Sequence, residues 1–216
     1  MPTLRHEREA WKAGRLLIAG VDEAGRGPLA GPVVAAAVMA RREVLEKESR
    51  GALLGVDDSK RLSPARREEI FAALTAQPGL SWAVGEASVE EIDRINILHA
   101  THLAMRRALA GLRPAPDLAL VDGRPVPGLP CPAEAIVKGD AQSVLIAAAS
   151  VVAKVTRDRL MAELDRAHPG YGLAQHKGYG TAAHLAALAR LGPSACHRRG
   201  FLPVRQLALG FGDAGA

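Results

Sequence analysis

The segment from Val144 to Ala167 constrains the fold of this 216-residue chain more than any other. Its pattern predicts one long helix, apolar on every side in its first half and charged from Lys154 onward. A helix without a polar face has to be covered all round, so we expect the other elements to enclose it. With 48% apolar and 24% charged residues, the chain can supply one core of substantial size.

Short apolar runs predict strands at residues 16–21, 29–40, 80–87, 118–121 and 133–137. Further helices are expected at residues 64–76, from Ser88 through Ile92 and then from Ile97 to Leu112, and at 181–191, with N-caps at Ser63, Ser88 and Thr181. Strands that come first and then alternate with helices are typical of an α/β fold with a mixed β-sheet flanked by helices.

Several classes of protein are disfavoured by composition. No apolar run is long enough to cross a membrane. The first fifteen residues are polar and include acids, which fits neither a signal peptide nor a transit peptide. Cys131 and Cys196 lie far apart and form neither a disulfide framework nor a zinc pattern. We therefore expect a cytoplasmic protein with no membrane partner.

The positive charge of the chain is concentrated in its C-terminal third. Between Lys154 and Arg205 there are nine Lys or Arg residues and three acids, whereas the whole chain carries a net charge of +5. Such an excess favours a polyanion as partner, although a solvated basic face would look the same. Aromatic residues make up only 3% of the chain, which disfavours a stacking platform for single strands.

Four carboxylates occupy unusual positions. Asp22 and Glu23 directly follow the first predicted strand, Asp122 follows the fourth, and Asp140 comes shortly after the fifth. Carboxylates at strand ends that meet would repel one another, and a divalent cation bound by oxygen ligands would remove the repulsion. Each acid could instead cap a turn, as the Asp122-Gly123 pair suggests. Taken together, the four favour a site for Mg²⁺ or Mn²⁺.

The loop from Gly20 to Gly27 begins like a phosphate-binding P-loop, but Arg26-Gly27 replaces the Lys-Ser/Thr pair. Two acids inside the loop would also repel a triphosphate, which disfavours a nucleotide triphosphatase. Gly25 and Gly27 allow a backbone to approach a ligand closely, and Arg26 between them could contact a phosphate or a sugar. A plain tight turn is the alternative.

Three other groups could contact a phosphate or a sugar. Asp58-Ser59-Lys60 precedes a predicted helix N-terminus, and Ser150 and Lys154 share one face of the long helix. A solvated loop explains the Asp58-Ser59-Lys60 segment equally well. Ser150 could instead bond back to its own helix, and Lys154 could extend its ammonium group to solvent where the helix leaves the core. Tyr171 and Tyr179 lie in a glycine-rich segment, where an exposed tyrosine could stack on a sugar or base. We expect Tyr179 to pack on the core instead.

Taken in order, these motifs resemble those of bacterial type 2 ribonuclease H, the ribonuclease HII family. The matching segments are Gly20-Val-Asp-Glu-Ala-Gly-Arg-Gly-Pro28, Asp58-Ser-Lys60, Asn96-Ile-Leu-His-Ala-Thr101, Val121-Asp-Gly123, Val137-Lys-Gly-Asp140, Ala149-Ser-Val-Val-Ala-Lys-Val-Thr-Arg-Asp158 and Tyr171-Gly-Leu-Ala-Gln-His-Lys-Gly-Tyr179. They extend from about residue 16 to residue 205, and the combination is far more specific than any one of them.

The resemblance implies a ribonuclease H-like catalytic core at residues 1–168 and a C-terminal helical segment at residues 169–216 that helps to bind the duplex. It implies an endonuclease that hydrolyses the RNA strand of RNA–DNA hybrids and nicks on the 5′ side of ribonucleotides embedded in duplex DNA. The products would carry 5′-phosphate and 3′-hydroxyl ends, and the cofactor would be Mn²⁺ or Mg²⁺. No heptad pattern is present, so we expect a monomer.

The resemblance also implies roles for single residues. Asp22, Glu23, Asp122 and Asp140 look like the catalytic acids that bind the metal. The loop Gly25-Arg26-Gly27 looks like the reader of the ribose 2′-hydroxyl, and Tyr171 like the residue that stacks on the neighbouring deoxyribose. The phosphate contacts would be Lys60, Ser150 and Lys154. Two alternatives stay open: a non-catalytic nucleic-acid-binding module, and a nuclease of related fold that acts on DNA junctions.

Overall fold

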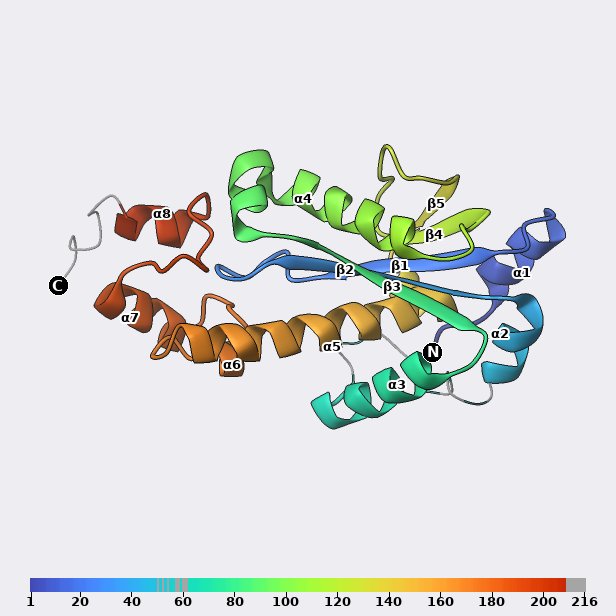
Figure 1. Cartoon of the computed structure of the whole chain (residues 1–216), viewed down its shortest axis with the longest axis horizontal. Coiled ribbons are helices and arrows are strands. Elements are labelled where there is room, and N and C mark those ends of the chain that lie inside the picture. Colours follow the sequence, from blue (N-terminus) through green and yellow to red (C-terminus); the bar gives the residue numbers. More distant parts are fainter. Residues whose placement is uncertain (50, 52, 54, 57–58, 60–61, 209–216) are drawn as a thin grey trace.

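The computed structural model describes residues 1–208 apart from 50, 52, 54, 57, 58, 60 and 61 (Figure 1). Its strands are β1 (Ile18–Ala24), β2 (Val33–Ala40), β3 (Leu80–Ala87), β4 (Leu118–Asp122) and β5 (Ala133–Ile136). Its α-helices are α1 (Arg5–Lys12), α2 (Arg42–Glu48), α3 (Pro64–Ala76), α4 (Val89–Gly111), α5 (Val144–Ala167), α6 (Leu173–His176), α7 (Ala182–Leu191) and α8 (Leu202–Ala208). A short 3₁₀ helix, η1, covers Gly139–Ala141.

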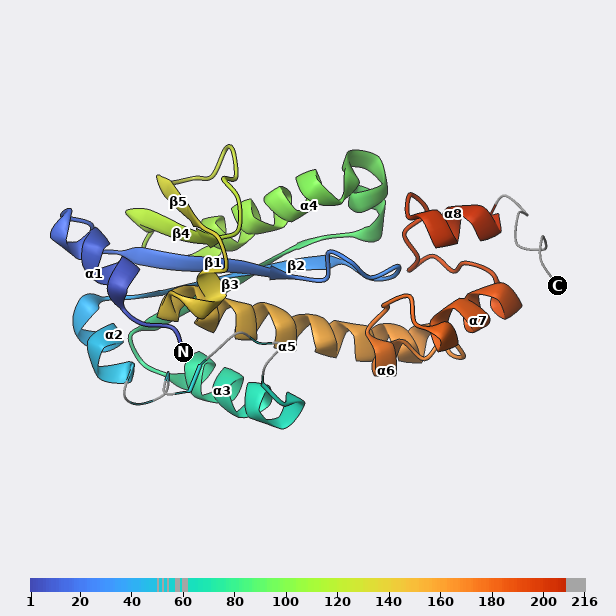
Figure 2. The same cartoon turned by 180° about the vertical axis from the view of Figure 1, so that it is seen from behind.

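The strands form one mixed sheet in the order β3-β2-β1-β4-β5. β2 pairs antiparallel with both β3 and β1, whereas β1, β4 and β5 are parallel. Helix α4 covers one face of the sheet, and α5 with α3 covers the other (Figures 1 and 2). The predicted α/β class with a mixed sheet flanked by helices is therefore confirmed.

The prediction that the first half of α5 lies at the centre of the molecule is also confirmed. Every residue from Val144 to Ala153 is buried, and most of them pack in the core between α5 and the sheet. β1 approaches α5 so closely that a Cβ atom added at Gly20 would lie 2.1 Å from the carbonyl carbon of Leu145. Only glycine fits at this position of the strand.

Helix starts agree with their predicted caps. Ser63 accepts a hydrogen bond from the Arg66 amide, and Ser88 and Glu91 form a complete capping box at the start of α4. Inside α4, Asn96 leaves the helical conformation with φ 64° and ψ 166°, between the two stretches over which helix was predicted. Helices α1, α2, α6 and α8 were not predicted.

The first strand is displaced from its predicted position. Leu16 is 70% exposed and precedes β1, which starts at Ile18. The strand continues through Asp22 and Glu23 to Ala24, because all three residues pair with β2. The two acids therefore end the strand rather than follow it.

The C-terminal helices α6, α7 and α8 lie at one end of the molecule, beyond the sheet (Figure 2). Their core contains Tyr171, Leu173, Leu188 and Val204, and it packs on Met161 of α5 and on the loop before β2. Among the residues that the structure describes, no helix combines the length and apolar character needed to span a bilayer.

Candidate active site

The parallel pairing of β1 and β4 brings two of the predicted acids together. Val21 is in register with Val121, so Asp22 and Asp122 come next on adjacent strands at the same end of the sheet. Side chains alternate along a strand, and this places both carboxylates on the face that α5 covers. For Asp22 and Asp122, the structure therefore brings together two of the strand-end carboxylates that the sequence analysis considered as a group.

The other two acids reach the same region from neighbouring segments. Asp140 lies in η1, directly after β5, and is buried. The preceding amide, that of Gly139, donates a 2.6 Å hydrogen bond to Asp122 Oδ1 and ties this turn to the end of β4. Glu23 points across to Arg26, whose Nη1 lies 3.1 Å from Glu23 Oε1.

Electrostatics show that the four carboxylates act on one another. Burial raises the pKa of Asp22 well above its ordinary value, and the negative charges of Glu23, Asp122 and Asp140 raise it further. Burial also raises the pKa of Glu23, although the positive charge of Arg26 opposes that shift. A proton or a bound cation would relieve the repulsion that the neighbouring carboxylates exert on Asp22.

This donor set fits a divalent cation by its chemistry. Carboxylate oxygens are the ligands that Mg²⁺ and Mn²⁺ prefer. In the described part of the chain no three acidic, imidazole or thiol groups converge closely enough to hold an ion as they are now oriented. Asp22 Oδ1 accepts from the Glu23 amide, and Glu23 Oε1 is paired with Arg26, so the second oxygen of each carboxylate is the one not engaged in these two contacts.

A cavity of about 180 Å³ adjoins the acids. It combines carboxylates, glycine backbone and basic side chains, and its lining comes from β1, the following loop, α5 and the segment before α7. The lining residues are Asp22, Glu23, Ala24, Gly25, Arg26, Gly27, Ser59, Ser150, Lys154, Arg157 and Tyr179. Five of the predicted substrate contacts line this cavity: Gly25, Arg26, Gly27, Ser150 and Lys154. Tyr171, which was also predicted, does not.

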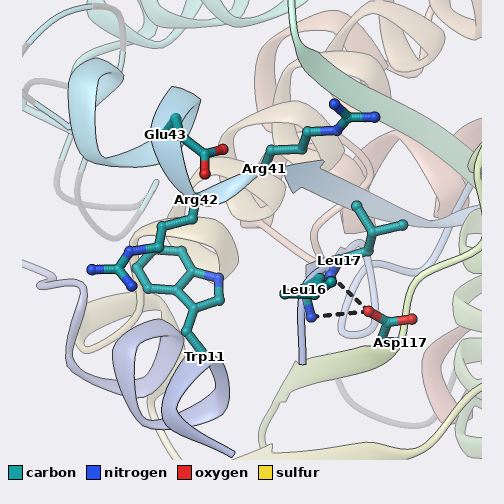
Figure 3. A pocket seen from close by; sticks show the side chains of 7 residues that line it. All are labelled: Trp11, Leu16, Leu17, Arg41, Arg42, Glu43 and Asp117. Carbon is teal, nitrogen blue, oxygen red and sulfur yellow. Dashed lines mark hydrogen bonds between the residues drawn. The ribbon is translucent and has the colours of Figure 1, made fainter. Parts of the chain in front are cut away.

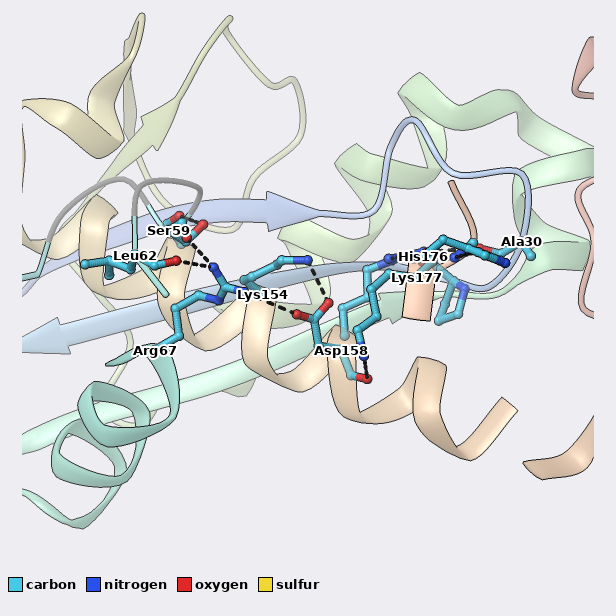
Figure 4. Close-up of polar contacts among 12 residues, drawn as sticks. Ala30, Ser59, Leu62, Arg67, Lys154, Asp158, His176 and Lys177 are labelled. Carbon is cyan, nitrogen blue, oxygen red and sulfur yellow. Dashed lines mark hydrogen bonds and ion pairs between the residues drawn. The ribbon is translucent and has the colours of Figure 1, made fainter. Parts of the chain in front are cut away.

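The polar face of α5 contributes Lys154 and Arg157 to the lining of the cavity, and Figure 4 shows the contacts of Lys154 with its neighbours. Lys154 Nζ lies 2.7 Å from Asp158 Oδ1, one turn further along the helix. Burial lowers the pKa of Lys154, and the ion pair with Asp158 opposes the shift. Ser150 donates a 2.8 Å hydrogen bond to Ser59 Oγ, which links α5 to the segment before α3. The remaining predicted phosphate contact, Lys60, lies outside the described residues.

The structure reverses the expectations for the two tyrosines. Tyr171 is 8% exposed, packs in the C-terminal core, and donates its hydroxyl to the Gly192 carbonyl at 2.7 Å. Its ring is therefore not available to stack on a sugar. Tyr179, which we expected to pack on the core, is 47% exposed and lines the cavity. An added Cβ at Gly27 would lie 3.6 Å from its ring, so the ring adjoins the glycine loop.

A larger cavity, about 650 Å³, lies at the opposite end of β1 (Figure 3). Trp11, Arg42 and the backbone of Leu16 and Leu17 surround it, and Asp117 accepts hydrogen bonds from both leucine amides. None of the predicted site residues lines it. By size alone, this cavity would be taken as the active site. The carboxylates instead identify the smaller cavity as the candidate active site.

Sequence reasoning missed two arginines of the site. Arg157 lines the cavity, and Arg198 lies directly behind the glycine loop, yet both are fully buried. The sequence analysis counted them only as part of the basic C-terminal third. No local pattern distinguishes a buried arginine from a solvated one.

Carboxylates at neighbouring strand ends, flanked by a glycine loop and a basic helix face, are typical of one class of protein: α/β enzymes that use divalent metal ions to cut phosphodiesters. Comparison with known proteins gives the particular family. A family model described as Ribonuclease HII matches residues 19–204. A protein of Rhodospirillum rubrum named Ribonuclease HII is 58% identical over 207 residues, which cover 95% of this chain and 91% of that protein.

Solved structures agree with this match. The ribonuclease H2 from Pyrococcus horikoshii OT3 has a TM-score of 0.74 and 29% identity, covering 92% of this chain and 100% of that one. Bst-RNase HIII in complex with Mn²⁺ has a TM-score of 0.71 and 24% identity, covering 92% and 70%, and shows the fold alone. The chain belongs to the ribonuclease HII family, and it is an endoribonuclease of ribonuclease H type 2 with a ribonuclease H-like fold.

Proposed function

We propose that this ribonuclease H cuts the RNA strand of RNA–DNA hybrids and also nicks duplex DNA on the 5′ side of single embedded ribonucleotides. The products carry 5′-phosphate and 3′-hydroxyl ends. The observation that carries the proposal is the cavity that joins Asp22 and Glu23, the consecutive acids near the end of β1, to the loop Gly25–Gly27 and to Lys154. This arrangement supports a cation site, a loop backbone that approaches the sugar closely, and a phosphate contact on one surface.

The acids Asp22, Glu23, Asp122 and Asp140 would hold Mn²⁺ or Mg²⁺. When bound, the metal supplies Lewis-acid stabilisation of phosphate charge and activation of water. The parallel pairing of β1 and β4 brings Asp22 and Asp122 to the same end of the sheet, which supports a shared role in holding the ion. The Mn²⁺ in the complex of Bst-RNase HIII supports a divalent ion in this fold without distinguishing the two metals.

Lys154 and Ser150 would contact the phosphates that flank the cut bond, since both line the cavity beside the acids. Lys60 stays a predicted phosphate contact. Tyr179 takes the stacking role that the resemblance implied for Tyr171, because it is the exposed tyrosine and its ring adjoins Gly27. An aromatic ring beside the loop would press on the sugar next to the ribonucleotide.

The C-terminal segment of residues 169–216 would extend the duplex-binding surface from the catalytic core of residues 1–168. Its described part contributes Tyr179 to the cavity. We propose that the enzyme acts as a monomer in the cytoplasm, where a reducing environment suits two cysteines, Cys131 and Cys196, that are not joined to each other.

The test uses a labelled DNA duplex with one ribonucleotide, an all-DNA duplex of the same sequence, and an RNA–DNA hybrid, each with EDTA, Mg²⁺ or Mn²⁺. We expect metal-dependent cuts in the hybrid and a single nick 5′ of the ribonucleotide, with the all-DNA duplex intact. Cutting of the all-DNA duplex would favour a DNA-junction nuclease. A salt-sensitive gel shift without any cut would instead favour a binding module that has lost its chemistry.

A further inference from the structure

Two arginine side chains are buried beneath the loop that connects β1 to β2. Arg157 comes from α5 and is 1% exposed, and Arg198 comes from the segment before α8 and is 0% exposed. Charged side chains are rarely buried to this extent unless a carboxylate is paired with them. Among the residues that the structure describes, no carboxylate lies within ion-pair distance of either guanidinium.

Backbone carbonyls take the place of the missing carboxylates. Arg198 donates to the carbonyl oxygens of Gly25 at 2.6 Å, Arg26 at 3.0 Å, Gly31 at 2.9 Å and Pro32 at 3.2 Å. A guanidinium suits this arrangement because its five N–H groups form a rigid planar fork. A lysine ammonium at the same place could not reach carbonyls on both sides of the loop.

Arg157 fills the space next to this fork. It donates to the carbonyl oxygens of Ala30, Pro32 and Lys177, each at 3.1 Å. A Cβ atom added at Gly25 would lie 1.9 Å from Arg157 Nε, and Gly25 has a φ of +95°. The loop is thus held against two cations, with glycine required where it turns.

The carbonyl directions determine where the loop amides point. In a planar trans peptide, the C=O of one residue and the N–H of the next point in opposite directions. Because the Gly25 and Arg26 carbonyls point to Arg198, the amides of Arg26 and Gly27 point away from it, in a loop whose residues line the cavity. Within the described residues neither amide donates to a protein acceptor.

We propose that Arg198 is a positioning residue for ribose recognition: by holding the carbonyls of Gly25 and Arg26 inward, it presents the amides of Arg26 and Gly27 to the 2′-oxygen of the ribonucleotide. The inference rests on the proposed function, in which this loop reads the 2′-hydroxyl. It assigns the geometry of the loop to a residue that is far away in the sequence and does not contact the substrate.

Two buried cations next to each other have an electrostatic cost that supports a functional role. Burial, together with the charge of Arg157, lowers the pKa of Arg198 to about 9, and burial lowers the pKa of Arg157 to about 10. An apolar pair of similar volume would avoid this cost but would leave the loop carbonyls without donors. The arginines stay protonated near neutral pH, so the loop keeps its orientation there.

The test compares Arg198→Lys with the wild-type side chain in the cleavage-deficient Asp122→Asn background, so that bound duplexes stay uncut. Dissociation constants are measured for two duplexes that differ only in one nucleotide, ribo or deoxy. Arg190→Lys is the matched control, because Arg190 also donates to a carbonyl, that of Gly170, but from an exposed position on α7. Circular dichroism and urea unfolding establish that each variant is folded.

We expect Arg198→Lys to reduce the preference for the ribonucleotide duplex by about tenfold or more, since two hydrogen bonds to the 2′-oxygen are weakened. Its affinity for the all-DNA duplex stays close to that of the parent, and Arg190→Lys keeps the full preference. Equal losses for both duplexes would mean that Arg198 only stabilises the fold, which would overturn the proposal. If the parent itself shows no preference, the proposed reading of the 2′-hydroxyl fails first.

A second measurement does not depend on the variant being folded. Amide hydrogen exchange of Arg26 and Gly27 is followed by NMR in the Asp122→Asn protein, alone and with each duplex. We expect both amides to exchange readily in the free protein and to be protected by the ribonucleotide duplex only. Protection already present in the free protein, or equal protection by both duplexes, would contradict the proposed direction of the loop amides.

Discussion

Replacing Gly20 by alanine should damage both stability and catalysis, because this glycine is where β1 and α5 touch. The new Cβ would lie 2.1 Å from the carbonyl carbon and 2.4 Å from the carbonyl oxygen of Leu145, and 2.4 Å from the Ile146 nitrogen. Ordinary contact begins at 3.4 Å, so the two backbones have to separate by roughly 1 Å. No flexible side chain can move aside to relieve the contact.

Overpacking a core usually lowers the free energy of unfolding by about 1–3 kcal/mol. Because rigid backbone lies on both sides of Gly20, we expect Gly20→Ala to lose about 3 kcal/mol or more. The free energy of unfolding of a domain is about 5–15 kcal/mol, so most of the protein should stay folded at 25 °C. A shift of about 1 Å between catalytic groups can cost about 100-fold in rate. Since β1 carries Asp22 and α5 carries Lys154, we expect a 10- to 100-fold lower kcat.

Gly85→Ala is the matched control. Its Cβ would lie 2.2 Å from the Ala104 carbonyl oxygen, an equally severe contact, but between β3 and α4 on the other side of the sheet. Urea unfolding followed by circular dichroism gives the stability of both variants, and cleavage of the single-ribonucleotide duplex gives kcat. The reasoning is refuted if Gly20→Ala loses less than about 1 kcal/mol, or if both variants lose activity equally.

Three further predictions test the site and its surroundings. Asp22→Asn and Asp122→Asn should each abolish cleavage while hybrid binding in a gel-shift assay is kept or strengthened, because a charge that repels phosphate is removed; near-normal cleavage by both would contradict the assignment. Lys154→Ala should lower the salt dependence of binding by about one unit of slope, since one phosphate contact is lost, and an unchanged slope would exclude that contact. Burial and the neighbouring His184 lower the pKa of His197 to about 4. As the pH falls below 6.5 the unfolded chain binds the proton first, so the free energy of unfolding should fall by up to about 1.4 kcal/mol per pH unit down to pH 4. The urea unfolding midpoint should depend less on pH in His197→Gln than in the wild type. An identical pH dependence in both proteins would show that His197 is not the cause of the loss of stability.

Regular patterns along the chain predicted most of the fold. The strand at Leu80–Ala87 and the helices at Pro64–Ala76 and Val144–Ala167 have the bounds that were expected. These segments combine clear periodicity with strong caps, so local preference and tertiary packing agree. The short helices α1 and α2 lack a side-chain cap at their N-termini, which removes the signal that would have revealed them.

Long-range contacts explain what the sequence could not predict. Tyr171 and Tyr179 lie in the same glycine-rich segment, and only the packing of Tyr171 on the C-terminal core decides which ring is exposed. Likewise, Arg198 and Arg199 are adjacent, yet Arg198 is buried behind the glycine loop whereas Arg199 is exposed. Residue type and local pattern are the same in both cases, so the difference arises from tertiary structure.

The long helix connects the apolar pattern of the chain with its chemistry. Gly20 and Asp22 lie on one face of β1, because side chains alternate along a strand. Gly20 lets the backbone of α5 approach at Ile146, and Ser150 and Lys154 follow on the same row of that helix at intervals of four residues. The close approach that buries the apolar half of α5 therefore also carries Lys154 to the cavity beside Asp22. The residue at which the helix changes from apolar to charged, Lys154, is thus the one that lines the cavity beside Asp22.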